Sequence, residues 1–236
     1  MRMRRKKHLD DKLAGVSDYL ISPCCKQKDL RIAVLEKEYF DFYSIFGNSN
    51  PVHLEIGCGK GRFAVLCAEA HQENNFLALE KSANVIYEGC VLAKNKGLNN
   101  IRFVNMDARL LPKYFAPHSV EHIYLNFSCP YPKKTYAARR LTHPSFLSFY
   151  RDILICGGKI YQKTDNIDFF EFSLESFCEN GFTVEFSTRD LHSHVDLENI
   201  ETEYEQKFSS QGIPICALIA SPISDLNDKR MHSNIE

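Results

Sequence analysis

The segment VHLEIGCGKGRF, residues 52–63, constrains the fold more than any other part of the chain. It begins as an apolar run and passes into three glycines at alternate positions, Gly57, Gly59 and Gly61, before a helical pattern starts. Alternate glycines permit positive φ angles and let a ligand approach the backbone, while the following helix offers free N–H groups. The segment therefore predicts a strand, a tight loop and a helix that together bind a nucleotide-like ligand.

The spacing of these glycines separates two kinds of cofactor. A dinucleotide-binding loop has the pattern GxGxxG, whereas here the third glycine comes one residue early and Arg62 takes the sixth position. A GxGxG loop with an acidic residue on the preceding strand, here Glu55, resembles the class I S-adenosylmethionine (SAM)-dependent methyltransferases. The spacing disfavours an NAD-dependent oxidoreductase, and an ordinary glycine-rich turn is the simpler alternative.

Two more acidic residues follow the next apolar strands. The strand FLALE ends in Glu80, whose two carboxylate oxygens can accept hydrogen bonds from both hydroxyls of a ribose. Asp107 follows the strand-like residues 101–105, and the resemblance implies that a side chain at this place meets the adenine. The alternative role of Asp107 is that of a turn residue or helix cap.

Apolar strands alternate with helical patterns along most of the chain, which predicts an α/β fold with a doubly wound, mostly parallel sheet. We expect a basic arm over residues 1–25, a single domain over residues 26–221 and a polar tail over residues 222–236. The predicted helices cover residues 29–46, 63–70, 82–96, 145–155 and 170–177, and the predicted strands cover residues 52–56, 76–80, 101–105, 120–127, 159–164, 183–189 and 215–221.

Charge and cysteine content exclude several classes of protein. The net charge of −1 means that any nucleic acid must be held by local basic patches rather than by a global field. Nine cysteines without a CxxC pair argue for a reducing cytosol, and against a disulfide framework or a zinc site. Since no apolar stretch approaches about 18 residues, we expect a soluble, cytoplasmic protein that binds neither a membrane nor a metal. The sequence leaves monomer and homodimer open.

Four motifs in order make a more specific resemblance. They are LEIGCGKGRF, NFSCPYPKK, TDN and TEYEQKF, and the second follows strand 120–127, where ligands bind in open parallel sheets. With them the chain resembles the bacterial tRNA (guanine-N7-)-methyltransferases almost end to end. The resemblance implies a Rossmann-like seven-stranded sheet and transfer of a methyl group from SAM to N7 of guanine at tRNA position 46.

The resemblance also assigns roles to residues. It places cofactor contacts at Glu55, Glu80 and Asp107, beside the three glycines. It places substrate contacts at Lys133, Asp165, Thr202, Glu203, Tyr204 and Glu205, and RNA contacts at Lys134, Thr135, Tyr136, Arg139 and Arg140. The alternative for the acidic run at 201–205 is a solvated helix face.

One departure from the family pattern falls in the loop after strand 120–127. The family reads FSDPWPKK, whereas this chain has Cys129 at the position of the aspartate usually assigned as catalytic, and Tyr131 at the tryptophan. Guanine N7 carries a lone pair and no proton, so its methylation needs positioning rather than a general base. A carboxylate would stabilise the positive charge that develops on the purine, and cysteine is a poor acceptor. We expect a slowed enzyme rather than a dead one.

Asp165 of the TDN motif is our candidate for the missing carboxylate, because it ends the neighbouring strand. The alternative is that Asp165 and Asn166 cap the next helix. Tyr131 and Tyr136 offer stacking surfaces for RNA, and the basic start MRMRRKK offers phosphate contacts. Two rival functions stay open: a homologue that binds SAM and tRNA but transfers methyl groups negligibly, and a methyltransferase with another acceptor.

Overall fold

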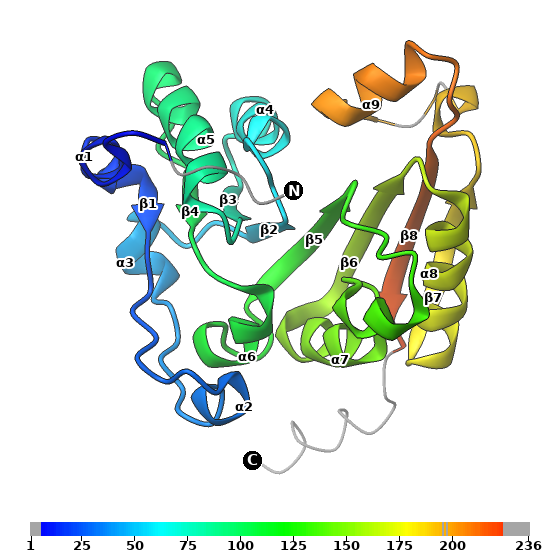
Figure 1. Ribbon diagram of the computed structural model, residues 1–236, viewed down its shortest axis with the longest axis horizontal. Coiled ribbons are helices and arrows are strands. Elements are labelled where there is room, and N and C mark those ends of the chain that lie inside the picture. Colours follow the sequence, from blue (N-terminus) through cyan, green and yellow to red (C-terminus); the bar gives the residue numbers. More distant parts are fainter. Residues whose placement is uncertain (1–5, 195, 197, 224–236) are drawn as a thin grey trace, which may run out of the picture.

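The computed structural model describes residues 6–194, 196 and 198–223. Its strands form one eight-stranded sheet in the order β1-β4-β3-β2-β5-β6-β8-β7 (Figure 1). Neighbouring strands pair in parallel, except that β8 is antiparallel to both β6 and β7. The strands are β1 (Leu20–Ile21), β2 (Val52–Ile56), β3 (Asn75–Leu79), β4 (Ile101–Val104), β5 (Val120–Asn126), β6 (Leu154–Thr164), β7 (Phe182–Thr188) and β8 (Cys216–Pro222).

Helices connect these strands and confirm the predicted α/β class. Among the described residues, every helix is too short or too polar to cross a lipid bilayer. The α-helices are α1 (Leu9–Ala14), α2 (Leu30–Ala33), α3 (Phe42–Phe46), α4 (Arg62–Ala70), α5 (Ala83–Lys96), α6 (Leu111–Tyr114), α7 (Pro144–Ile153), α8 (Ile167–Glu179) and α9 (Glu203–Ser209), and the 3-10 helices are η1 (Ser17–Tyr19), η2 (Ala108–Leu110), η3 (Lys134–Arg139) and η4 (Leu191–Ser193).

Strands β2 to β8 are the seven predicted strands, and β1 adds an eighth at the edge. It comes from the segment predicted as an arm and pairs in parallel with β4, Leu20 lying opposite Phe103. Val16, just before it, is buried against the layer formed by α4 and α5. A two-residue strand carries too little periodicity to be recognised in a sequence. Residues 1–5 of the predicted arm and residues 224–236 of the predicted tail lie outside the described residues.

The helix predicted for residues 29–46 is wrong, because the segment forms only the two short helices α2 and α3. Between them the chain runs along α6: the N–H of Phe40 donates to the carbonyl of Tyr114 at 2.8 Å, and the two rings stack at 5.2 Å. Asp41 then begins α3 by accepting a hydrogen bond from the N–H of Ser44. Contacts with α6 therefore override a helical pattern that the aromatic spacing suggested.

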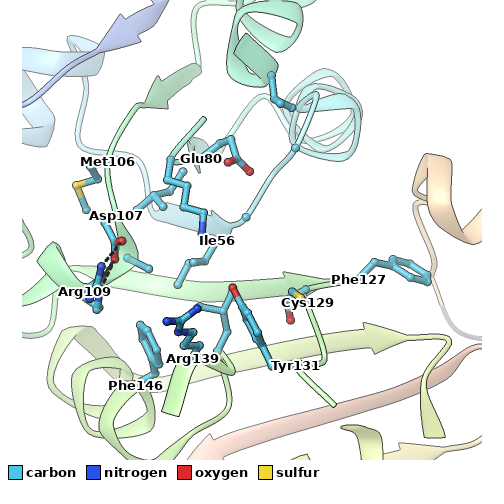
Figure 2. Close-up of a pocket in the computed structure, with 18 of the residues that line it drawn as sticks. Ile56, Glu80, Met106, Asp107, Arg109, Phe127, Cys129, Tyr131, Arg139 and Phe146 are labelled. Carbon is cyan, nitrogen blue, oxygen red and sulfur yellow. Dashed lines mark hydrogen bonds and ion pairs between the residues drawn. The ribbon is translucent and has the colours of Figure 1, made fainter. Parts of the chain in front are cut away.

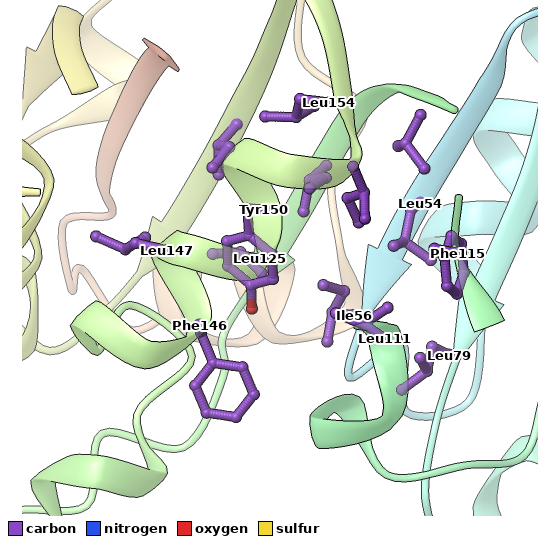
Figure 3. Packing of buried hydrophobic residues seen from close by; sticks show 14 of the residues in the cluster. Leu54, Ile56, Leu79, Leu111, Phe115, Leu125, Phe146, Leu147, Tyr150 and Leu154 are labelled. Atoms are coloured by element: carbon purple, nitrogen blue, oxygen red, sulfur yellow. The ribbon is translucent and has the colours of Figure 1, made fainter. Parts of the chain in front are cut away.

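Two apolar layers enclose the sheet. One packs Leu54 and Leu125 against α6, α7 and α8, with Tyr150 of α7 fully buried at its centre (Figure 3). The other packs Phe76 and Phe103 against α4 and α5. Because successive strand residues point to opposite faces, β3 and β4 each contribute to both layers. The sheet is thereby covered on both faces, as expected for a doubly wound fold.

Two glycines set how closely α4 and α5 approach the sheet. A Cβ atom on Gly61, at the start of α4, would lie 2.4 Å from Cε1 of the Phe103 ring, and one on Gly89 of α5 would lie 2.5 Å from the same atom. Real Cβ atoms do not come so near another heavy atom, so both helices reach their positions only because these residues have no side chain. The glycine-rich turn is thus seated directly on β4.

We expect Gly89→Ala to destabilise the fold by about 1–3 kcal/mol, because the added methyl group would overpack the space under the Phe103 ring. Urea denaturation monitored by circular dichroism measures this difference. Asn95→Ala, on the exposed side of the same helix, is the matched control and should change the free energy of unfolding by less than about 0.5 kcal/mol. Equal stability of the two variants would contradict the close approach.

Candidate active site

Two adjoining cavities open beyond the carboxyl ends of the central strands. The large cavity has a volume of about 820 Å³ and extends from Glu80 and Asp107 to the loop after β5 (Figure 2). The small cavity, of about 480 Å³, lies between the glycine-rich turn, α5 and α9. Both are lined by Gly57, Gly59, Val85, Phe127 and Tyr204. One elongated ligand can therefore occupy both.

The glycine-rich turn separates β2 from α4 as predicted. Gly57 and Gly59 have φ angles of 82° and 55°, and the N–H of Gly57 donates to the carbonyl of Leu79 at 2.8 Å. No heavy atom lies within 4 Å of a Cβ built on Gly59. A ligand can consequently approach the backbone of the turn from the side of the cavities.

Glu55 of β2 is buried beside the small cavity. Its Oε1 accepts a hydrogen bond from Nδ2 of Asn126 at 3.1 Å, while its Oε2 and the Oδ1 of Asn126 have no partner among the described residues. Burial raises the pKa of Glu55 to about 7, against the hydrogen bond from Asn126, which lowers it. Buried polar atoms are normally paired. Two unpaired acceptors at a cavity wall therefore fit a positively charged donor such as an α-ammonium group.

Glu80 and Asp107 lie at the ends of adjacent strands in the wall of the large cavity. Oε1 of Glu80 accepts the N–H of Ser82 at 2.9 Å, which orients the carboxylate at the start of α5. Asp107 caps η2, and its two oxygens bind the guanidinium of Arg109 at 2.9 and 2.8 Å. The hydrogen bond from Arg109 is the main reason that the pKa of Asp107 is lowered. The cap predicted as the alternative role of Asp107 is present, in a residue that also lines the cavity.

The loop after β5 forms the opposite wall. Phe127 and Tyr131 have φ angles of 47° and 42°, a left-handed conformation that is uncommon for aromatic residues and often found at functional sites. Cys129 is exposed between them and lines the large cavity, as Figure 2 shows. Arg140 supports this loop, since its guanidinium donates to the carbonyls of Pro130 and Tyr131 at 2.9 and 3.2 Å.

The residues predicted to contact RNA lie on η3, next to this wall. Arg139 lines the large cavity, and its guanidinium carbon lies 4.6 Å from the centre of the Tyr136 ring. Arg140 instead faces inward, 4.3 Å from the ring of Phe172. Exposed side chains cover the rest of the segment: Lys133, Lys134, Thr135, Tyr136 and Arg139. The structure thus gathers the predicted basic residues beside the cavity, with Arg140 used within the protein.

Asp165 follows β6 and is half-buried, but in the described chain it lines neither of the two cavities. Its neighbour Asn166 caps α8, its Oδ1 accepting the N–H of Phe169 at 2.8 Å. The capping alternative therefore holds for Asn166. The role of Asp165 as a replacement carboxylate stays a prediction.

The segment Thr202–Glu205 is divided between surface and interior. Glu203 and Tyr204 line the small cavity, whereas Glu205 is fully buried. Oγ1 of Thr202 accepts the N–H of Glu205, and the Glu205 carboxylate accepts the N–H of Thr202, which is a capping box for α9. The predicted contact of Glu205 with guanine is therefore not supported by the position of its side chain, and the solvated face proposed as the alternative is wrong for this residue.

Sequence reasoning missed three residues of the site. Asn126 is the partner of Glu55, Phe127 lines both cavities, and Ser128 has a buried hydroxyl without a partner among the described residues. All three belong to the NFSC motif, at the end of the predicted strand 120–127. Their place at a strand end was the available signal.

This sheet order, with a glycine-rich turn after the central strand and acidic residues at the following strand ends, defines a class I SAM-dependent methyltransferase. The crystal structure of the 16S rRNA methyltransferase KamB has the same fold, with a TM-score of 0.61, 15% identity, and coverage of 80% of this chain and 96% of that one. The fold is shared with a geranyl diphosphate C-methyltransferase from Streptomyces coelicolor crystallised with S-adenosyl-L-homocysteine, at a TM-score of 0.50, 18% identity, and coverage of 76% and 75%.

Closer relatives identify the family. A family model described as a putative methyltransferase matches residues 49–218. The tRNA (guanine-N(7)-)-methyltransferase of Brevibacillus brevis is 47% identical over 75% of this chain and 83% of its own length, and that of Bacillus subtilis is 40% identical over 91% and 96%. The chain belongs to the tRNA (guanine-N7-)-methyltransferase family.

We expect Glu55 to give the affinity for SAM a pH dependence, because its buried carboxylate lies beside the small cavity. Its pKa of about 7 means that the carboxyl group is largely protonated in acid, and binding of an ammonium group must then release this proton. We expect the Kd for SAM, measured by isothermal titration calorimetry, to rise by up to about tenfold per pH unit as the pH falls from 6.5 to 5.5. The ammonium group of the ligand stays charged throughout this range.

Two variants serve as controls for this titration. Glu55→Gln should bind SAM more weakly and lose the pH dependence, whereas Glu80→Gln should bind more weakly and keep it. A steep pH dependence that survives in Glu55→Gln would show that another group titrates.

Proposed function

We propose that this protein transfers a methyl group from SAM to N7 of guanine in tRNA, at position 46 of the variable loop, and that it acts in the cytoplasm. The observation that carries the proposal is the meeting of the two cavities at Phe127 and Tyr204, the larger of which is also lined by Arg139 of the basic helix η3. SAM can lie along the strand ends, and the guanine can enter from the exposed side of the loop after β5. Membership of the family supplies the reaction type.

The residues of the two cavities fit both ends of SAM. Glu80 can accept hydrogen bonds from the ribose hydroxyls, and the unpaired oxygen of Glu55 can accept one from the α-ammonium group. The cations in the wall of the small cavity complement the α-carboxylate: Lys6, Lys60, Arg62 and Lys207. Bound SAM supplies an electrophilic methyl group on a sulfonium centre.

Guanine N7 attacks this methyl group with its own lone pair, so the protein has to orient the base and exclude water rather than remove a proton. Ser128 presents a buried hydroxyl to the large cavity, where it can donate to or accept from the edge of the base. Cys129 lies at the place where the family has its aspartate. A thiol stabilises the cationic purine less than a carboxylate does, which makes slow turnover the expected state of this enzyme.

The charged residues beside the cavity suit an RNA strand. Lys133, Lys134 and Arg139 are exposed on one segment, and Tyr136 offers a ring for base stacking. The protein has a net charge of −1, so these local groups have to supply the phosphate contacts. Affinity for tRNA should accordingly fall with salt concentration.

A second candidate function rests on Cys129 alone: a homologue that binds SAM and tRNA with little transfer. The binding residues of the two cavities are the same for both candidates. Only the rate of methyl transfer distinguishes the enzyme from the binding homologue.

Methyl transfer tests both candidates. We expect the wild type to form 7-methylguanosine when incubated with labelled SAM and unmodified tRNA, and Cys129→Asp to turn over about 10²- to 10³-fold faster, because the carboxylate restores one electrostatic contact in the transition state. Nucleoside analysis of the digested tRNA identifies the product, and a tRNA with adenosine at position 46 tests the acceptor.

Cys178→Asp is the control, since Cys178 is an exposed residue of α8 that lines neither cavity. It should leave the rate unchanged. Product formation by Cys129→Asp but not by the wild type would favour the binding homologue, and no product from either would overturn the proposed reaction.

A further inference from the structure

A buried ion pair fixes the start of α9. Nζ of Lys163, on β6, lies 2.9 Å from Oε2 of Glu205, and the side chain of Glu205 is completely buried. Oε1 of the same carboxylate accepts a hydrogen bond from Nδ2 of Asn199 at 2.6 Å and lies 3.2 Å from Nε2 of His192. Oε2 also accepts the N–H of Thr202 at 3.3 Å. The carboxylate is thus surrounded by partners from its own chain.

Lys163 is equally occupied. Besides Glu205, its ammonium group donates to Oδ1 of Asn199 and to the carbonyl of Ile200 at 3.0 Å. An ammonium group has three donors, and all three are used. A rotation of Glu205 toward a substrate would leave this charge buried without its counter-ion, a change that costs several kcal/mol in proteins.

Tyr204, one residue before Glu205, is the part of this segment that faces the cavities. Its side chain is 56% exposed and lines both cavities. Its ring stacks on Phe127 at 6.0 Å and on Phe208 at 6.2 Å between ring centres, with interplanar angles of 26° and 24°. Phe127 and Phe208 also lie 6.0 Å apart, so the three rings form a cluster at the junction of the cavities, and Tyr204 is its most exposed member.

We infer that Glu205 is a positioning residue that never contacts the guanine: with Lys163 it holds the start of α9 so that the ring of Tyr204 forms a stacking surface for the target base. This inference rests on the proposed function, whose acceptor is a purine. Aromatic rings bind unpaired bases by stacking, and the site lies where the methyl donor and the acceptor must meet. The buried pair acts on the reaction only through the position of this ring.

The inference is tested by measuring kcat/KM of protein variants with tRNAs that carry different bases at the acceptor position. Inosine lacks the 2-amino group with which guanine would donate to a carboxylate. We expect Glu205→Gln to lower kcat/KM by about 10- to 10²-fold, and by the same factor for tRNA with guanosine as for tRNA with inosine at the acceptor position. A Glu205→Gln effect that vanishes with inosine would show direct recognition and overturn the inference.

A double-mutant cycle tests whether the Lys163–Glu205 pair acts through the ring of Tyr204. Tyr204→Ala should lower kcat/KM, Tyr204→Phe should retain it because the stacking surface is kept, and Glu205→Gln combined with Tyr204→Ala should be no worse than the worse single variant. Lys163→Arg keeps the charge and should retain more activity than Lys163→Met. Additive losses in the Glu205→Gln, Tyr204→Ala double variant would mean that the pair acts elsewhere, against the inference.

Amide hydrogen exchange gives a readout that does not need turnover. Lys163→Met and Glu205→Gln should speed exchange in residues 203–209 at least tenfold and leave α5 unchanged. If the wild type forms no 7-methylguanosine but this local change occurs, the proposed function fails while the anchoring of α9 stands. Unchanged exchange in α9, in variants whose far-ultraviolet circular dichroism is that of the wild type, would overturn the anchoring itself.

Discussion

The packing of Gly61 and Gly89 under the ring of Phe103 is the constraint on which the other features of the site depend. It seats the glycine-rich turn on β4 and brings the start of α4 and the middle of α5 to the sheet. The turn can then bind a ligand through its backbone, because no side chain stands between it and the cavities. A bulkier residue at either position would move a helix, and with it the walls of both cavities.

Parallel pairing supplies the second requirement, which is alignment. Ile56 pairs with Leu79, and Leu79 pairs with Val104, so the three strands end at the same level. Acidic residues near these ends therefore meet along one edge although they are far apart in the sequence. Lys163 lies near this edge on β6, and its charge lowers the pKa of Glu55 against the larger effect of burial. The same lysine pairs with Glu205 at the start of α9, so one cation interacts with both buried carboxylates.

Local patterns allowed much of the fold to be predicted. The GxGxG turn, the helix that ends at Gly97, and the burial of Cys67 and Cys90 follow from short-range rules of conformation and periodicity, and the structure confirms them. The predicted helix at 145–155 ends earlier, because β6 begins at Leu154 and includes the glycines that were expected to separate helix and strand.

Features that depend on distant contacts could not be predicted. The residues 29–46 have a helical pattern but form only two short helices, because the chain between them packs against α6. The hydrogen bonds of Arg140 to the loop after β5 and its contact with Phe172 likewise left no signal in the sequence, and its RNA contact stays a prediction. The run TEYE lies between these two cases. T-x-x-E is itself a capping signature, so the sequence already contained the signal that Glu205 is used within the protein. The resemblance to the family instead implies substrate contacts for the same four residues.

Tyr204 belongs to the walls of both cavities, so in the proposed reaction the methyl donor and the acceptor base would both contact the same ring. A methyl donor that changes the free energy of each position of this ring would also change the affinity for a base stacked on it. Thermodynamic reciprocity requires that the base change the affinity for the donor by the same factor by which the donor changes the affinity for the base. In the proposed reaction, conversion of the donor to its demethylated product would therefore change the affinity for the RNA through the position of Tyr204.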